Sequence, residues 1–123
     1  MILVDTSIWI DHLRRGNREL VRALESEQVL THPFVIGELA CGNLSDREQT
    51  LMLLGNLPRA VAADHTEVLG LIGRHRLMGR GLGYADMHLL TSTLISPNAL
   101  LWTADKELAA TADELHVGYV PLP

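Results

Sequence analysis

Cysteine and aromatic residues are scarce in this chain, and each scarcity limits what the protein can be. The 123 residues include one cysteine, Cys41, which excludes an internal disulfide framework and suits a reducing compartment. Only 4% of the residues are aromatic, so leucine, valine, isoleucine and alanine must build the interior. We find neither a basic start followed by a long apolar region nor an apolar run close to the roughly 18 residues of a membrane span. We therefore expect a cytoplasmic protein without signal peptide or membrane anchor.

Positive charge is also in short supply. The formal net charge of −5 argues against a protein that coats nucleic acid through overall basicity, although acids gathered in one site can recruit cations that then meet phosphates. Apart from Lys106, all basic residues are arginine, whose planar fork suits phosphate oxygens. A run of arginines could track RNA phosphates or simply form a solvated helix face: Arg14, Arg15, Arg18 and Arg22.

Length and hydrophobic content predict one globular domain, residues 1–123. Short apolar runs predict strands at 2–4, 29–31, 57–62, 99–105 and 117–122. Amphipathic patterns predict helices at 6–13, 17–25, 33–42, 46–56, 64–78, 84–95 and 106–115. Helix starts are expected at Asn17, at a capping box of Ser45 and Glu48, and at Asp64 with Glu67. The alternation of strands and helices predicts a three-layer α/β/α sandwich with a mostly parallel central sheet.

Two of the expected strands end on an acid. Asp5 follows Ile2–Val4 in "LVDTS", and Asp105 ends "LWTAD". Either residue alone could be an ordinary helix cap. Ligand sites of parallel sheets, however, form beyond the carboxyl ends of the strands, so two strands that both end on an acid favour a shared site.

Two further acids lie in helices that are otherwise apolar. Glu38 is surrounded by apolar residues in "PFVIGELAC", so we expect it to be buried and to need a cation or hydrogen-bond partner, unless it faces solvent on a narrow polar stripe. Asp86 lies in the first helical turn of "YADMHLL", where the helix dipole alone would favour an acid. The preceding "GRGLG" could bring backbone close to a ligand.

Four acids gathered in one cleft would repel one another without a counter-ion. Carboxylate oxygens select hard cations such as Mg²⁺ or Mn²⁺ rather than zinc. Such ions activate water and neutralise charge on a phosphoryl group. This chemistry explains why the first strand stops on Asp5: a metal site needs a rigidly held oxygen.

The chain resembles the PIN-domain ribonucleases and, among them, the VapC toxins of bacterial toxin–antitoxin pairs. The match is carried by "LVDTSIWID", "IGELACG", "GYADMHLL" and "TADKEL", in the family's order and over essentially the whole chain. The resemblance implies a PIN-like fold and a Mg²⁺- or Mn²⁺-dependent endoribonuclease. Its acidic quartet would be Asp5, Glu38, Asp86 and Asp105, with Thr103 as a supporting polar neighbour.

The same resemblance implies partners. A small antitoxin would block the site, often with a basic side chain among the acids, and the toxin would form a homodimer. The apolar stretch "TLMLLGNL" is a candidate docking surface, although ordinary core is the better explanation. One departure is visible, since Leu108 stands where many relatives carry phenylalanine; this concerns packing more than chemistry.

Other chemistries find less support. The six histidines are scattered without metal-ligand spacing and are interpreted as surface or core residues. Ser7 and Cys41 have no evident base partner, which argues against nucleophilic catalysis. The glycines before Asp86 do not form a phosphate loop, because no Lys-Ser/Thr follows. Two alternatives stay open: a non-catalytic module whose acidic pocket holds a basic partner, and a PIN-fold nuclease that matures RNA or acts on DNA.

Overall fold

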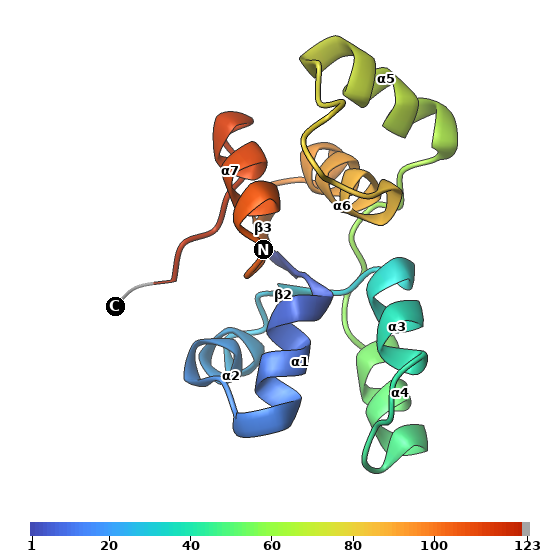
Figure 1. The fold of residues 1–123 in the computed structure, drawn as a ribbon. Helices are drawn as coiled ribbons and strands as arrows, with labels where there is room; N and C mark the ends of the chain where they lie inside the picture. The colour runs from blue at the N-terminus through green and yellow to red at the C-terminus, as the bar shows by residue number, and fades with distance from the viewer. Residues whose placement is uncertain (122–123) are drawn as a thin grey trace.

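The computed structural model describes residues 1–121, in which strands and helices alternate along the chain (Figure 1). The strands are β1 (Ile2–Val4), β2 (Val29–Leu30) and β3 (Leu100–Trp102). The helices are α1 (Thr6–Arg15), α2 (Arg18–Glu25), α3 (Pro33–Ala40), α4 (Arg47–Gly55), α5 (His65–His75), α6 (Tyr84–Ile95) and α7 (Lys106–Glu114).

The three strands form a parallel sheet in the order β2-β1-β3. Helices cover both of its sides: α1 to α4 lie on one side, and α6 and α7 lie on the other with α5 packed on α6 (Figure 1). The expected three-layer α/β/α sandwich is therefore confirmed. Parallel strands need such crossovers, because each must return to the same end of the sheet before the next begins.

Two expected strands are wrong. Residues 57–62 contribute only one bridge, between Thr31 and Arg59, and the tail contributes one bridge, between Leu101 and Gly118. Pro58 carries no N–H and can only accept, from Thr31 N, so the ladder beside β2 stops after one step. Residue 122 of the expected last strand lies outside the described residues.

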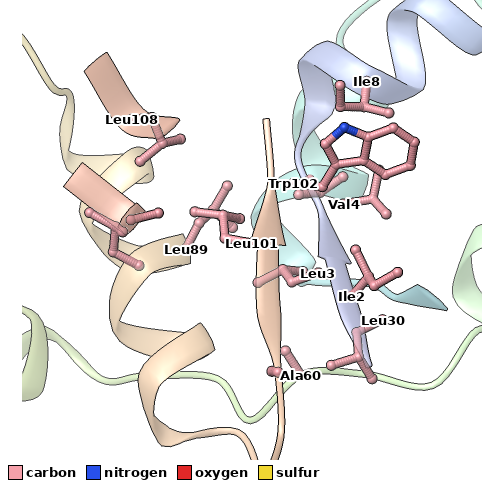
Figure 2. Packing of buried hydrophobic residues seen from close by; sticks show 14 of the residues in the cluster. Ile2, Leu3, Val4, Ile8, Leu30, Ala60, Leu89, Leu101, Trp102 and Leu108 are labelled. Carbon is pink, nitrogen blue, oxygen red and sulfur yellow. The ribbon is translucent and has the colours of Figure 1, made fainter. Parts of the chain in front are cut away.

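The core forms on both faces of the sheet because side chains alternate along each strand. Figure 2 shows Leu3 of β1 and Leu101 of β3 pointing toward Leu89 of α6. Val4 and Trp102, one residue further along, pack on the opposite side. All five side chains are buried. This burial fixes where β1 and β3 end and therefore where the residues after them lie.

Two predicted helix starts are confirmed. Asn17 caps α2, its side chain accepting from Leu20 N at 3.0 Å. Asp64 and Glu67 form the expected capping box of α5, with each side chain accepting from the other residue's backbone N–H. Helix α5 ends at His75, earlier than expected, because Arg76 adopts a left-handed conformation with φ of 53°.

The capping box expected at Ser45 and Glu48 is wrong. Helix α4 begins after Asp46, whose φ of 47° is left-handed and whose side chain makes no cap bond in the described part of the chain. Ser45 contributes its carbonyl oxygen instead, which accepts from Thr50 Oγ1. Among residues 1–121, none of the helices combines the length and apolar character that crossing a bilayer requires.

Candidate functional site

The candidate site begins where β1 and β3 end side by side. Val4 pairs with Trp102 in the sheet, and Asp5 N donates to the Trp102 carbonyl oxygen at 2.9 Å. Strand β1 leads through α1 and α2 to β2 on one side, whereas β3 lies on its other side. Parallel sheets bind ligands at such a reversal of strand order, beyond the carboxyl ends of the strands.

Asp5 is almost fully buried, at 7% exposure, and three donors compensate its charge. Its Oδ1 accepts from Thr6 N at 2.8 Å, which caps α1. Its Oδ2 accepts from Ser7 Oγ at 2.8 Å and from Thr103 Oγ1 at 2.7 Å. Asp5 therefore caps α1, and its carboxylate is also held by hydroxyls that follow β1 and β3. Thr103 is one of its direct hydrogen-bond partners. The cost of burying a charge explains why several donors converge on it.

Ser7 is a functional candidate that sequence reasoning missed. Besides donating to Asp5, its hydroxyl accepts from Ala104 N at 3.0 Å, across the gap between β1 and β3. Thr103 Oγ1 accepts in the same way from Asp105 N at 3.1 Å. The two hydroxyls thus link the acid after β1 to the backbone after β3. The signal for this was the hydroxyl residue two places after the strand-ending acid, in "DTS".

Glu38 is exposed, so the expectation that it is buried is wrong. Only one stripe of α3 packs into the core, with Val35 and Leu39 buried, and the apolar composition of the segment concealed this. Glu38 nevertheless belongs to the site, because its Oε1 accepts from Thr6 Oγ1 at 2.8 Å. Thr6 follows Asp5 directly, so this contact places the α3 carboxylate beside the end of β1.

Asp86 is half-buried at the start of α6, and its Oδ2 accepts from Gly83 N at 2.9 Å. Burial raises the pKa of Asp86, and the charges of Asp5 and Asp105 raise it further, against the opposing effect of the Gly83 hydrogen bond. Asp5 and Asp105 therefore act electrostatically on Asp86, although the three residues come from separate segments of the chain. Gly79 and Gly81 lead into α6 with positive φ angles of 75° and 79°, a conformation that glycine adopts readily.

Asp105 is exposed and caps α7, with its Oδ1 accepting from Leu108 N at 2.9 Å. The capping explanation thus holds for this residue, but capping uses only one of its two oxygens. The other oxygen accepts no hydrogen bond within residues 1–121, and the charge of Asp105 acts on Asp86.

The oxygens of the quartet suit a hard cation. Within residues 1–121, Glu38, Asp86 and Asp105 each retain one carboxylate oxygen that accepts no hydrogen bond. In the same range no three His, Cys, Asp or Glu side chains already converge to hold an ion. The ion pairs found there all lie elsewhere: Asp11–Arg15, Glu19–Arg22 and Glu114–Arg80. The carboxylates therefore have hydroxyl and amide partners but no cationic side chain, a donor set of the kind that binds Mg²⁺ or Mn²⁺.

A buried histidine supports the two helices that carry Glu38 and Asp86. His32 Nδ1 accepts from Phe34 N at 3.0 Å at the start of α3, and its Nε2 bonds to Ser92 Oγ of α6 at 3.0 Å. Ser92 Oγ also accepts from Ala63 N. Burial, with a smaller effect of His88, lowers the pKa of His32 to about 4, so this ring is neutral at pH 7. The interpretation of His32 as a core residue is confirmed.

Comparisons with known proteins agree with this architecture. The family model described as "PIN domain" matches residues 2–114, a range that includes every candidate residue. Ribonuclease VapC32 of Mycobacterium tuberculosis, from strains CDC 1551 and H37Rv, is 49% identical over 114 residues. The alignment covers 93% of this chain and 92% of that relative.

Proposed function

The chain belongs to the PIN-domain family, and we propose that it is a metal-dependent endoribonuclease of the VapC type, the toxin of a toxin–antitoxin pair. In this proposal residues 1–123 form one nuclease domain that acts in the cytoplasm. Its catalytic centre is the carboxylate cluster of Asp5, Glu38, Asp86 and Asp105. One observation carries the assignment: at the edge where β1 and β3 end, Thr103 holds Asp5 and Thr6 holds Glu38. The charges of Asp5 and Asp105 also act on Asp86, and a bound cation would offset this repulsion.

The proposed cofactor is Mg²⁺ or Mn²⁺, which oxygens of Asp5, Glu38, Asp86 and Asp105 would hold. When bound, such an ion neutralises charge on the phosphoryl group and activates water for its attack on phosphorus. Zinc is a poor substitute, because it favours histidine and cysteine ligands.

The chain's own residues supply orientation and a proton acceptor. Ser7 and Thr103 hold the Asp5 carboxylate in one orientation, as partners of metal ligands commonly do. Thr6 holds Glu38 by one oxygen, which leaves the other free within the described chain to accept a proton from the attacking water. Burial and the charges of Asp5 and Asp105 disfavour the carboxylate form of Asp86, and a bound cation would favour it.

The test is to map the 5′ ends of cleaved RNA after expression, and to repeat cleavage with highly purified protein. We expect cleavage at defined positions that requires Mg²⁺ or Mn²⁺ and stops with EDTA. Full activity in EDTA would refute the metal mechanism. RNA binding without cleavage under any metal would favour a non-catalytic module, and cleavage of DNA alone would favour a DNA nuclease of the same fold.

We also propose an antitoxin that docks on α1, α2 and α4. Met52 and Leu53 of "TLMLLGNL" are 59% and 58% exposed, so part of this stretch is surface rather than core. Leu53 lines a largely apolar groove of about 360 Å³. Leu13 lines this groove and also a second one, of about 250 Å³, that reaches Glu38. A peptide crossing Leu13 could therefore bury apolar side chains and place an arginine or lysine beside Glu38, where a cation is favoured.

Pull-downs from the native host test this partner. We expect a small protein that co-purifies with wild type, is lost with Leu53→Asp and is retained with Met78→Asp, a matched change at another exposed apolar side chain. Recovery of no small partner, together with no small gene next to this one, would contradict the proposal.

A homodimer is proposed from the exposed apolar side chains Leu69 of α5 and Ile95 of α6. Light scattering after size exclusion measures the oligomeric state.

A further inference from the structure

A row of rings lies beside the carboxylate cluster and has no part in the proposed cleavage. It runs from His32 through Phe34, His88 and Tyr84 to His65, and we call these five residues the ring row. Phe34 lies 5.4 Å from His32 and 4.4 Å from His88 between ring centroids. Tyr84 lies 4.6 Å from His88 and 5.6 Å from His65. The row therefore connects the starts of α3, α5 and α6, with His32 and His88 buried and the other three rings exposed.

The exposure of two aromatic rings in this row is unusual for so aromatic-poor a chain. Of the five aromatic residues, all within the described range, only Phe34 and Tyr84 are exposed, at 36% and 44%. Trp9 and Trp102 are buried in the core. Both exposed rings contact the same histidine, His88. Two large rings left partly in water at one place, from distant parts of the chain, point to a binding surface.

The ring row adjoins the candidate catalytic residues on two helices. Phe34 and Glu38 are four residues apart on α3, so they share a face and lie about 6 Å apart along the helix axis. Tyr84 and Asp86 both lie in the first turn of α6, two residues and about 3 Å of axial rise apart, with their side chains on different faces of the helix. A nucleotide whose phosphate lies at the carboxylates would thus have its neighbour close to these rings.

The rings are also held in place before any ligand arrives. Tyr84 OH is hydrogen-bonded to His65 Nδ1, which limits rotation of the tyrosine. The Phe34 ring packs against His32 and His88. His32 is itself fixed by its hydrogen bonds to Phe34 N and Ser92 Oγ. A surface ordered in advance loses little conformational entropy when it binds.

We propose that Phe34 and Tyr84 form a stacking platform for a base of single-stranded RNA next to the cleaved phosphate. This inference rests on the proposed ribonuclease function. Every base has a π-face, so aromatic platforms bind single strands without needing a particular sequence. Stacking suits this protein in particular: its net charge of −5 disfavours binding through phosphates alone, and base contacts add affinity that does not depend on positive charge.

Cleavage kinetics on a short single-stranded RNA that spans the mapped cleavage position test the platform. We expect Tyr84→Leu and Phe34→Leu each to raise KM on the order of 10-fold with a much smaller change in kcat, because they remove a stacked base and leave the carboxylates in place. Tyr84→Phe keeps the aromatic ring, so most of the increase in KM should be absent in this variant. Met78→Ala, at an exposed side chain that is not part of the row, serves as the control. Thermal melts verify that each variant is folded.

An RNA in which one nucleotide at a time lacks its base makes the test specific. At one position next to the cleavage point, the abasic RNA should raise KM for wild type but hardly at all for Tyr84→Leu, since base and ring act as a pair. Two results would overturn the platform while the ribonuclease function stands. In one, Tyr84→Leu cleaves the RNA with the same KM as wild type. In the other, the effects of the abasic nucleotide and of Tyr84→Leu on KM simply add. If the KM change in Tyr84→Leu accompanied a change in oligomeric state, Tyr84 would belong to a protein interface, and the platform would also be overturned. Absence of any cleavage or RNA binding by wild type would instead remove the proposed function itself.

Discussion

Asp5 combines two roles that are usually separate. Its Oδ1 caps α1, and its Oδ2 is held by two hydroxyls, one from each side of the gap between β1 and β3. A cap alone would not need burial, and a buried carboxylate would not persist without donors. The side chain is thus fixed in position and charged, which is what a metal ligand requires.

We expect Asp5→Asn to abolish RNA cleavage, by at least about 100-fold, and to relieve growth inhibition. Asparagine keeps the shape and can still accept from Thr6 N, but it removes the negative charge. Circular dichroism should show a folded protein. Asp46→Asn is the matched control at a helix start whose side chain makes no cap bond in the described structure, and it should stay active. Wild-type cleavage by Asp5→Asn would mean that Asp5 is only a cap.

The charge cluster makes a second prediction, on stability. Asp86→Asn removes one of the mutually repelling carboxylates while its side-chain oxygen can still accept from Gly83 N, so it should stabilise the metal-free protein, on the order of 1 kcal/mol. Added Mg²⁺ or Mn²⁺ should raise the melting temperature of wild type, because the ion binds the folded site. The increase should be smaller in Asp86→Asn. Thermal melts in EDTA and in excess metal measure both effects.

A role of Asp86 in helix stability alone predicts the opposite result. If Asp86 served only the helix dipole, its loss would lower stability slightly and metal would have no effect on either protein. A variant less stable than wild type in EDTA, with no response to metal, would therefore rule out the shared site.

At the scale of elements, the helices begin in different ways although their sequences look alike. Asp64 caps α5 in a reciprocal box with Glu67, whereas Asp46 before α4 adopts a left-handed conformation that directs its side chain away from capping. Both segments carry an acid or hydroxyl followed by a glutamate three residues later. The backbone conformation imposed by the preceding loop decides which one becomes a cap.

We expect Asp64→Ala to lower the free energy of unfolding by about 1 kcal/mol, because Glu67 N loses its acceptor. Asp46→Asn should change it by less than about 0.5 kcal/mol, as a surface substitution away from such a bond. Urea titrations followed by circular dichroism measure both values. Equal losses in the two variants would show that the hydrogen bond of the capping box contributes nothing of its own.

At the scale of the whole molecule, His32 joins parts that are far apart in the chain. Its ring bonds to the start of α3 and to α6, and through Ser92 to the segment that carries Ala63. Helices α3 and α6 lie on different sides of the sheet (Figure 1). They carry Glu38 and Asp86, so this buried contact helps to set the distance across the candidate site.

This contact predicts a pH dependence of stability. The pKa of His32 is lowered from 6.5 to about 4 in the folded protein, so between these values the unfolded chain binds more protons. The free energy of unfolding should therefore fall as the pH is lowered from 6.5 toward 4, by up to about 3 kcal/mol from this residue. Above pH 6.5 the contribution is fully present. Burial also lowers the pKa of His88, which adds in the same direction.

Urea unfolding at a series of pH values tests this prediction. His32→Asn should be less stable at pH 7, since it loses part of the buried hydrogen bonding, but its stability should depend less on pH between 4 and 6.5. The raised pKa of Asp86 acts in the opposite direction at low pH and is common to both proteins. Identical pH slopes in wild type and His32→Asn would show that His32 does not titrate as described.

Local pattern determined much of this protein. The apolar runs predicted β1 and β3, although β3 ends at Trp102, three residues before Asp105, and the cap signals at Asn17 and Asp64 predicted two helix starts. These features depend on residues within a few positions of one another, so the sequence alone contains them. The family motifs are local in the same sense, and the four short motifs together are enough to propose the acidic quartet.

Tertiary structure alone decided the exposure of Glu38, the role of Ser7, and the reduction of two expected strands to single bridges. Each depends on a partner far away in the chain. Glu38 is exposed because only one stripe of α3 meets the core, and Ser7 reaches Ala104 only because β1 and β3 pair in register. Burial and long-range hydrogen bonds are properties of packed elements, and no short stretch of sequence specifies which elements will meet.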